Sequence, residues 1–136
     1  MLNVQVRLII GKVPTMLIAK EFTFDAAHRL LNYNGLCANL HGHTYKLQVV
    51  LSGSVLKNGL VFDFVDLKKI VSEKVIKKLD HKFINEIIKQ PSAENISIWI
   101  WNQLKKNLPL YEIRLWETPT SFVVYKGSDL EKKTKK

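Results

Sequence analysis

The chain has 136 residues, a single cysteine and a formal net charge of +9 at pH 7. This length is typical of one domain, which buries about two-thirds of its unfolded surface and needs no disulfide. Because one cysteine cannot form an internal disulfide, we expect a reducing, cytoplasmic setting. The positive charge favours an anionic partner. The lysines are scattered along the chain, so they do not indicate which class of anion binds. The apolar residues near the start are interrupted too often for a signal peptide or a membrane span.

Two long strands are expected in the first half of the chain, at residues 17–28 and 43–53, which are rich in β-forming residues. The loop that joins them carries Cys37. We treat residues 1–15 as an extension, either an extra strand or a segment upstream of a start at Met16. Residues 16–127 then form a single domain, and residues 128–136 form a basic, flexible tail.

Two helices are expected next. The first has apolar residues at three- and four-residue spacing, and its N-cap is either Asp63 or Asp66. The second begins near Ser92, directly after Pro91. The apolar positions that we expect these two helices to bury are Leu67, Ile70, Val71, Val75, Leu79, Ile96, Ile100, Leu104 and Leu108.

Residues 110–118 and 120–128 have the composition of two further strands, separated by Pro119. The order ββααββ predicts an α+β fold in which a four-stranded antiparallel sheet carries both helices on one face. The other face, which we expect to be apolar in pattern, and the two sheet edges must then meet water, a ligand or another subunit.

Three of the four histidines gather at the facing ends of the first two strands. His41 and His43 are two residues apart on a strand, so their side chains leave the same face about 7 Å apart. His28 ends the preceding strand, and antiparallel pairing through the loop brings it opposite this pair. Three neutral imidazoles with an open fourth position are the ligand set of a catalytic zinc ion.

The roles of Cys37 and His81 stay open on spacing alone. Cys37 is either a fourth zinc ligand, which makes the site structural, or a buried inert thiol, or a base whose pKa a neighbouring cation lowers. His81 follows Asp80 just beyond the end of the first helix, where the simplest role of a histidine is that of a cation favoured by the helix dipole.

Six motifs occur in the order and at about the separations found in the 6-pyruvoyl-tetrahydropterin synthase and 6-carboxy-tetrahydropterin synthase family, which this sequence resembles over residues 17–126. They are FDAAHRL, CANLHGHTY, FDFVDLK, LDHKFIN, PSAENI and WETPTS. The resemblance implies a tunnelling fold (T-fold), in which the sheets of a trimer join into one oligomeric barrel. Two such trimers stack into a homohexamer, which gives the free face and edges a partner.

The resemblance also implies the role of each site residue. Zinc is held by His28, His41 and His43, Cys37 abstracts a proton, and His81 with Asp80 relays it. Glu117 anchors the pterin ring, and Glu94 lies near the same site, contributed across a subunit interface. The substrate implied is 7,8-dihydroneopterin triphosphate, whose vicinal hydroxyls suit zinc. The pterin edge offers two N–H groups to a carboxylate.

The family has two branches. Three residues separate Cys37 from His41, a spacing that resembles the 6-carboxy enzymes, which feed 7-deazaguanine synthesis for queuosine or archaeosine. The alternative is a 6-pyruvoyl enzyme, which eliminates triphosphate. A structural zinc-binding module is the non-enzymatic rival. A nucleic-acid binder is disfavoured because the strands carry few aromatic residues on which bases could stack, and we expect neither a nucleic-acid nor a membrane partner.

Overall fold

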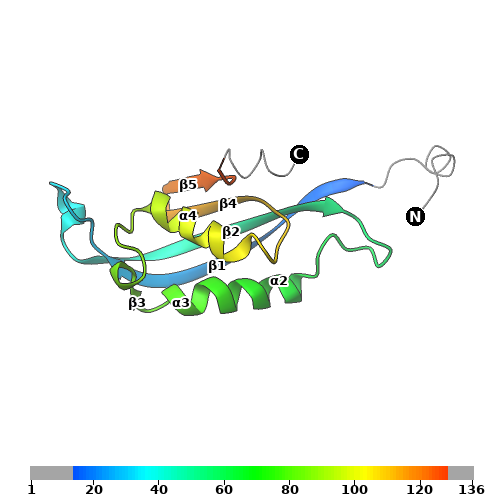
Figure 1. The fold of residues 1–136 in the computed structure, drawn as a ribbon, viewed down its shortest axis with the longest axis horizontal. Helices are drawn as coiled ribbons and strands as arrows, with labels where there is room; N and C mark the ends of the chain where they lie inside the picture. The colour runs from blue at the N-terminus through cyan, green and yellow to red at the C-terminus, as the bar shows by residue number, and fades with distance from the viewer. Residues whose placement is uncertain (1–13, 129–136) are drawn as a thin grey trace.

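The computed structural model describes residues 14–128, and these form a sheet with helices against it (Figure 1). The first two strands and the last two are longer than the one between the helices. In chain order, the elements are β1 (Thr15–His28), the 3₁₀ helix η1 (Leu36–Ala38), β2 (His41–Ser54), α2 (Phe64–Val71), the π-helical segment η2 (Ser72–Ile76), α3 (Lys77–Leu79), β3 (Lys82–Phe83), the 3₁₀ helix η3 (Ile84–Glu86), α4 (Ala93–Leu104), β4 (Leu110–Thr118) and β5 (Ser121–Tyr125).

The sheet has the strand order β3-β1-β2-β4-β5. The pairs β1–β2, β2–β4 and β4–β5 are antiparallel, which confirms the expected four-stranded antiparallel sheet. The helical segment from α2 to α3 and helix α4 both lie on one side of it (Figure 1). The prediction of both helices on one face is therefore also confirmed.

The prediction of only four strands was wrong, because β3 adds a fifth strand at the outer edge of β1. It pairs in parallel, with Lys82 opposite Ala26 and Phe83 opposite Ala27. A strand of two residues has no alternation that a sequence pattern could show. It exists because the chain leaving α3 is bonded to β1: the His81 N–H donates to the Asp25 carbonyl at 2.6 Å.

The first helix is continuous from residue 64 to 79, but its middle is π-helical. Asp63, one of the two expected N-caps, accepts a hydrogen bond from the Val65 N–H at 2.7 Å. The helix buries Leu67, Val71, Val75 and Leu79. A strict four-residue repeat drifts by about 40° per repeat on a helix of 3.6 residues per turn. The wider π turn reduces this drift and keeps the buried stripe facing the sheet.

The core lies between the helices and one face of the sheet. Phe24 and Tyr45 are a cross-strand pair of this face, and their rings stack with centroids 5.0 Å apart. Helix α4 contributes Ile96, Ile100 and Leu104, and the expected burial of these residues and of Leu108 is confirmed. Ser92, the expected start of this helix, is its N-cap and accepts from the Asn95 N–H at 3.1 Å.

The opposite face of the sheet carries charged side chains beside the exposed Leu17, Phe122 and Val124, so the expectation of an apolar face was wrong in part. Lys46 lies 3.9 Å from Glu21 and 4.2 Å from the centroid of the Trp116 ring. The Arg114 Nε donates to Glu112 at 2.6 Å. Alternating hydropathy does predict one water-facing side, but the cross-strand pair of Lys46 with Glu21 depends on register, whereas Arg114 and Glu112 are neighbours on β4. The free edges remain: β5 has one neighbour, and β3 covers β1 only at Ala26 and Ala27.

The expected N-terminal extra strand and nearly all of the basic tail, residues 129–136, lie outside the described residues. Within residues 14–128, no helix combines the length and the apolar composition that crossing a membrane requires.

Two valines of α2 offer a matched test of the core. Val71 is 0% exposed and Val65 is 74% exposed. We expect Val71→Ala to lower the free energy of unfolding by about 1.5–3 kcal/mol, because it removes buried methyl groups. Val65→Ala should change it by less than about 0.5 kcal/mol. Urea denaturation of both variants measures the difference, and equal losses would contradict the described core.

Candidate metal centre

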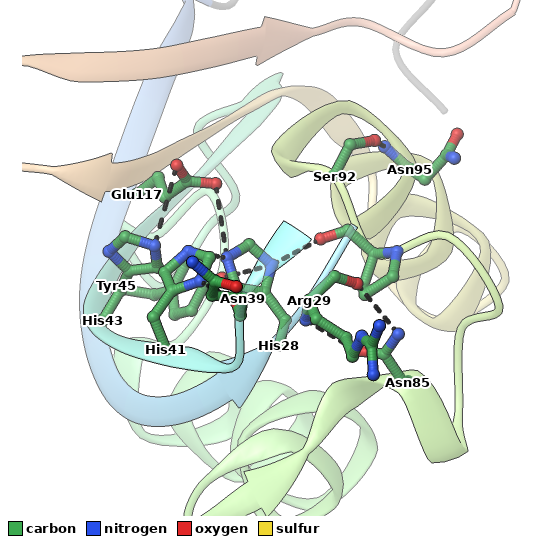
Figure 2. A network of polar contacts seen from close by, with 11 residues as sticks. His28, Arg29, Asn39, His41, His43, Tyr45, Asn85, Ser92, Asn95 and Glu117 are labelled. Atoms are coloured by element: carbon green, nitrogen blue, oxygen red, sulfur yellow. Dashed lines mark hydrogen bonds and ion pairs between the residues drawn. The ribbon is translucent and has the colours of Figure 1, made fainter. Parts of the chain in front are cut away.

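Three imidazoles converge at the end of the β1–β2 hairpin, on the helix-covered side of the sheet (Figure 2). His28 pairs directly with His41 in the β1–β2 register, and His43 follows two residues along the same face. Their ring centroids lie 4.6 to 5.0 Å apart. Their ligand atoms all lie within 4.8 Å of one another. The predicted meeting of the three histidines across the hairpin is confirmed.

Backbone carbonyls set the tautomers of two of these rings. The Nδ1 atom of His28 lies 2.7 Å from the Pro91 carbonyl oxygen, and the Nδ1 atom of His41 lies 2.7 Å from the Asn39 carbonyl oxygen. A carbonyl oxygen only accepts, so each Nδ1 must carry the hydrogen. In the neutral rings, both Nε2 atoms therefore present bare lone pairs. Such outer hydrogen bonds are the usual way in which a metal-binding imidazole is oriented.

The three Nε2 atoms fit a shared metal ion. Those of His28 and His41 lie 3.0 Å apart, and two lone pairs at this distance repel unless a cation lies between them. The Nε2 atom of His43 is buried and has no hydrogen-bond partner. A buried nitrogen without a partner is costly, and coordination removes that cost. Imidazole nitrogens bind Zn²⁺ at about 2.0–2.1 Å, which requires this kind of close grouping.

The electrostatics of the cluster favour the neutral form of His43. Burial lowers the pKa of His43, the Glu117 carboxylate opposes that shift, and His28 and His41 lower the pKa further. The ordinary histidine pKa is already below neutrality, so His43 is neutral at pH 7. A neutral ring can bind a metal without first losing a proton.

Glu117 faces the imidazoles from β4 (Figure 2). Its carboxylate oxygens lie 3.7 Å from the Nε2 atom of His43 and 4.0 Å from that of His28. Glu117 continues the alternation of the buried residues Ile113 and Leu115 along β4, so its side chain leaves the helix-covered face. Alternation thus directs a carboxylate, partly open to solvent, at the cation site.

Tyr45 lies beneath the cluster, with its hydroxyl 3.3 Å from the Nδ1 atom of His28. Burial raises the pKa of Tyr45, and Glu117 and Cys37 raise it further. The phenol therefore stays protonated.

Cys37 lies in η1, half-buried, with its carbonyl accepting from the Leu30 N–H at 2.8 Å. Among the described residues, the group of ligand atoms that contains the three imidazoles does not include its thiol. The thiol is thus not one of the ligand atoms that the cluster gathers. Its expected role in proton transfer stays a prediction.

Asp80 and His81 occupy a different place. The Asp80 Oδ1 lies 3.1 Å from the His81 Nδ1 and accepts from the Asp25 N–H at 3.0 Å. This bond from Asp25 is the main cause of a lowered pKa at Asp80, with His81 adding to it. Asp25 alternates with the positions of β1 that face the helices, so its side chain leaves the opposite face. His81, 79% exposed, groups with Asp25 and Asp80 and not with the three histidines.

Glu94, the remaining expected site residue, is exposed in the first turn of α4. It belongs to neither group of possible ligand residues among residues 14–128. Its expected role at a subunit interface stays a prediction.

Sequence patterns missed the groups that orient the site. The carbonyls of Asn39 and Pro91 have no side-chain signature, and Pro91 indicated only where a helix begins. The amides of Asn85 and Gln90, which bind the loop before Cys37, lie in a segment without periodicity. Only a three-dimensional arrangement identifies such groups.

Comparisons with known proteins identify the family of this chain. The family model described as 6-pyruvoyl tetrahydropterin synthase matches residues 17–128. A 6-carboxy-5,6,7,8-tetrahydropterin synthase of Haemophilus influenzae is 44% identical over an alignment that covers 79% of this chain and 96% of the relative. A dihydroneopterin monophosphate aldolase of Pyrococcus furiosus is 44% identical, covering 70% of this chain and 83% of the relative.

The structure of Caenorhabditis elegans 6-pyruvoyl tetrahydropterin synthase superposes with a TM-score of 0.79 at 30% identity, covering 87% of this chain and 99% of that one. This likeness confirms the α+β tunnelling fold that the sequence motifs predicted.

Removing one imidazole tests the metal centre. We expect about one metal ion per chain in the unaltered protein and much less in His43→Ala, because two imidazoles alone hold the ion weakly. His81→Ala is the matched control and should keep its metal, since His81 lies outside the cluster. Elemental analysis after gel filtration measures both. Equal metal content in His43→Ala and the unaltered protein would contradict the site.

Proposed function

This chain belongs to the 6-pyruvoyl tetrahydropterin synthase family, and on that premise we propose that it is a zinc-dependent lyase that converts 7,8-dihydroneopterin triphosphate into 6-carboxy-5,6,7,8-tetrahydropterin. The observation that carries the proposal is the convergence of three imidazole Nε2 atoms beside a carboxylate. The short spacing from Cys37 to His41 and the similarity to the Haemophilus influenzae enzyme support the carboxy product. The product would serve 7-deazaguanine synthesis for queuosine or archaeosine in the cytoplasm.

The donor set supports a catalytic zinc ion over a structural one. Structural zinc sites are closed by four protein ligands and usually include thiolates, whereas catalytic sites have three and leave one position for substrate. Here three imidazoles gather without the only cysteine of the chain. When bound, zinc would polarise the hydroxyls of the substrate side chain and acidify the protons that must move.

The residues of the chain would then have separate roles in binding the substrate and moving protons. Glu117, at the mouth of the cluster, would accept hydrogen bonds from the amino and ring N–H groups of the pterin and orient its side chain toward the imidazoles. Cys37 would take a proton from the side chain as a thiolate. Asp80 would hold the His81 ring through Nδ1, so that the Nε2 atom exchanges a proton with the substrate.

The position of His81 supports a site shared between subunits. Within one chain, Asp80 is bonded to the Asp25 N–H at the outer edge of β1, and the Asp80–His81 pair groups with the Asp25 carboxylate and not with the three histidines. A relay between Cys37 and His81 therefore needs a second copy of the chain. We propose a homohexamer built as a dimer of trimers, in which the free edges of β1 and β5 pair. Glu94, exposed on α4, would lie at such an interface.

Two other products are favoured by particular relatives. The structural likeness to the Caenorhabditis elegans enzyme favours a 6-pyruvoyl product, and the similarity to the Pyrococcus furiosus aldolase favours cleavage of the monophosphate. The carboxy product keeps only the side-chain carbon attached to the ring, whereas the pyruvoyl product keeps the whole carbon side chain. The mass of the product therefore separates them.

Product analysis tests the function. We expect the purified protein, incubated with 7,8-dihydroneopterin triphosphate, to take up water, release triphosphate and the outer two side-chain carbons as acetaldehyde, and form 6-carboxytetrahydropterin, as measured by mass spectrometry. Cys37→Ala should keep its zinc and lose about 10²–10⁴ in rate, the usual contribution of a general base. A pterin with its full carbon side chain would indicate the 6-pyruvoyl activity instead. Turnover of dihydroneopterin monophosphate alone would indicate the aldolase.

Mixing two inactive variants tests the shared site. Cys37→Ala and His81→Ala, each inactive alone, should recover part of the activity after joint dissociation and reassembly, because some sites then receive an intact residue from each chain. Light scattering should report a mass near six chains. Reassembly of each variant by itself is the control. A fully active monomer would refute both the assembly and the shared site.

A further inference from the structure

Two side-chain amides hold the start of the loop that carries Cys37. The Asn85 Oδ1 accepts from the Arg29 N–H at 3.0 Å, and its Nδ2 donates to the Arg29 carbonyl at 2.9 Å (Figure 2). The Gln90 Oε1 accepts from the Leu31 N–H at 2.7 Å, and its Nε2 donates to the Leu31 carbonyl at 2.9 Å. Each amide thus satisfies both backbone groups of one residue.

We call the Asn85 and Gln90 amides, with the residues that they bind, the clamp. The clamp continues the hydrogen bonding of the outer edge of β1 beyond His28, where the strand ends. A side-chain amide offers the same donor and acceptor as a peptide group. Strand β3 pairs with the outer edge of β1 at Ala26 and Ala27. After His28, the side-chain amides form the hydrogen bonds of that edge, at Arg29 and Leu31. The two clamped residues are two apart, as they are along one edge of a strand. The clamp therefore extends the geometry of β1 into the loop.

The clamp is linked to both the thiol and the metal cluster. Leu30, between the two clamped residues, donates its N–H to the Cys37 carbonyl at 2.8 Å. On the other side, Pro91 directly follows Gln90, and its carbonyl holds the Nδ1 atom of His28 at 2.7 Å. One short segment, residues 85–91, thus holds an imidazole of the cluster and the loop of Cys37 together.

Packing contributes little to holding this loop within the chain. Its apolar side chains face outward: Leu36 is 87% exposed and Leu40 is 67% exposed. A segment with few buried apolar contacts opens easily unless hydrogen bonds restrain it. The bonds of Asn85 and Gln90 act on its first residues, where a small rotation would displace the thiol most.

We propose that Asn85 and Gln90 are positioning residues that set the Cys37 thiol against the three histidines. This inference rests on the proposed role of Cys37 in proton transfer. The two amides contact neither the imidazoles nor the substrate in this proposal. They act through the backbone of residues 29–31 and through the bond from Leu30 to Cys37.

The test uses Gln90→Met, which keeps the length of the side chain and removes its hydrogen bonds. The matched control is Gln103→Met, because Gln103 is also half-buried and accepts only a bond from Lys78, away from the loop. Gln90→Met should keep its metal and speed hydrogen exchange at the Leu31 amide. We expect kcat to fall about 10- to 100-fold with KM changed less than about threefold, as displaced catalytic groups typically cause.

A double variant separates positioning from a structural role. In the Cys37→Ala background, Gln90→Met should cause no further loss of turnover, because the group that it positions is already absent. Gln90→Glu, which keeps the acceptor for the Leu31 N–H, should retain more activity than Gln90→Met. An equal loss in both backgrounds, a loss of metal, or an unchanged kcat in Gln90→Met would overturn the proposal.

If the protein does not turn over 7,8-dihydroneopterin triphosphate, the proposed lyase function is refuted. The positioning role of Asn85 and Gln90 can still be tested without turnover. The rate of Cys37 alkylation by iodoacetamide then replaces turnover. It should change several-fold in Gln90→Met and Asn85→Leu and stay constant in Gln103→Met. Identical alkylation rates and identical exchange at Leu31 in all variants would refute the clamp itself.

Discussion

The register of the β1–β2 hairpin is the constraint on which the rest of the site depends. His28 pairs with His41, and the pairing runs without interruption from there to Thr15 opposite Ser54. A slip of one residue would turn every side chain of a strand to the other face. The imidazoles would then separate, and Phe24 and Tyr45 would leave the core. The stacked core pair and the metal cluster are thus set by the same hydrogen-bond ladder.

The segment between α3 and α4 adds what the hairpin lacks. It follows the outer edge of β1 and contacts it in sequence: Asp80 bonds to Asp25, β3 pairs at Ala26 and Ala27, and the Pro91 carbonyl holds His28. Its two amides then continue along the loop. Because these contacts are polar and point at backbone groups, they fix direction as well as distance. The segment therefore fixes the orientation of a ligand side chain, His28, at the end of β1.

The expected site residues form two separate groups around the sheet. The imidazoles and Glu117 lie on the covered face, where burial lowers the pKa of His43. The Asp80–His81 pair is bonded to Asp25, whose side chain leaves the polar face. A barrel of several chains offers an explanation for this division, because the free edges of β1 and β5 are where strands of other copies can pair. The charged side chains of the open face, such as Lys46 and Glu21, argue against its burial as a wholly apolar interface.

Local pattern determined much of this protein from the sequence alone. Strand composition placed β1 and β2 well enough to bring three histidines together, since antiparallel pairing follows from a hairpin. Four-residue spacing and Ser92 placed α4, because helical periodicity and capping act within a few residues. The motif order identified the family, which the comparisons bear out.

Only the tertiary structure decided which face carries His81, which carbonyls orient His28 and His41, and that β3 exists at all. It also decided which charged side chains of the open face meet across strands, such as Lys46 with Glu21. These features depend on groups distant in the chain or on backbone atoms, and neither leaves a periodic signal. The physical reason is that hydropathy and capping act over neighbouring residues, whereas a hydrogen bond between residues 28 and 91 exists only once the chain has folded.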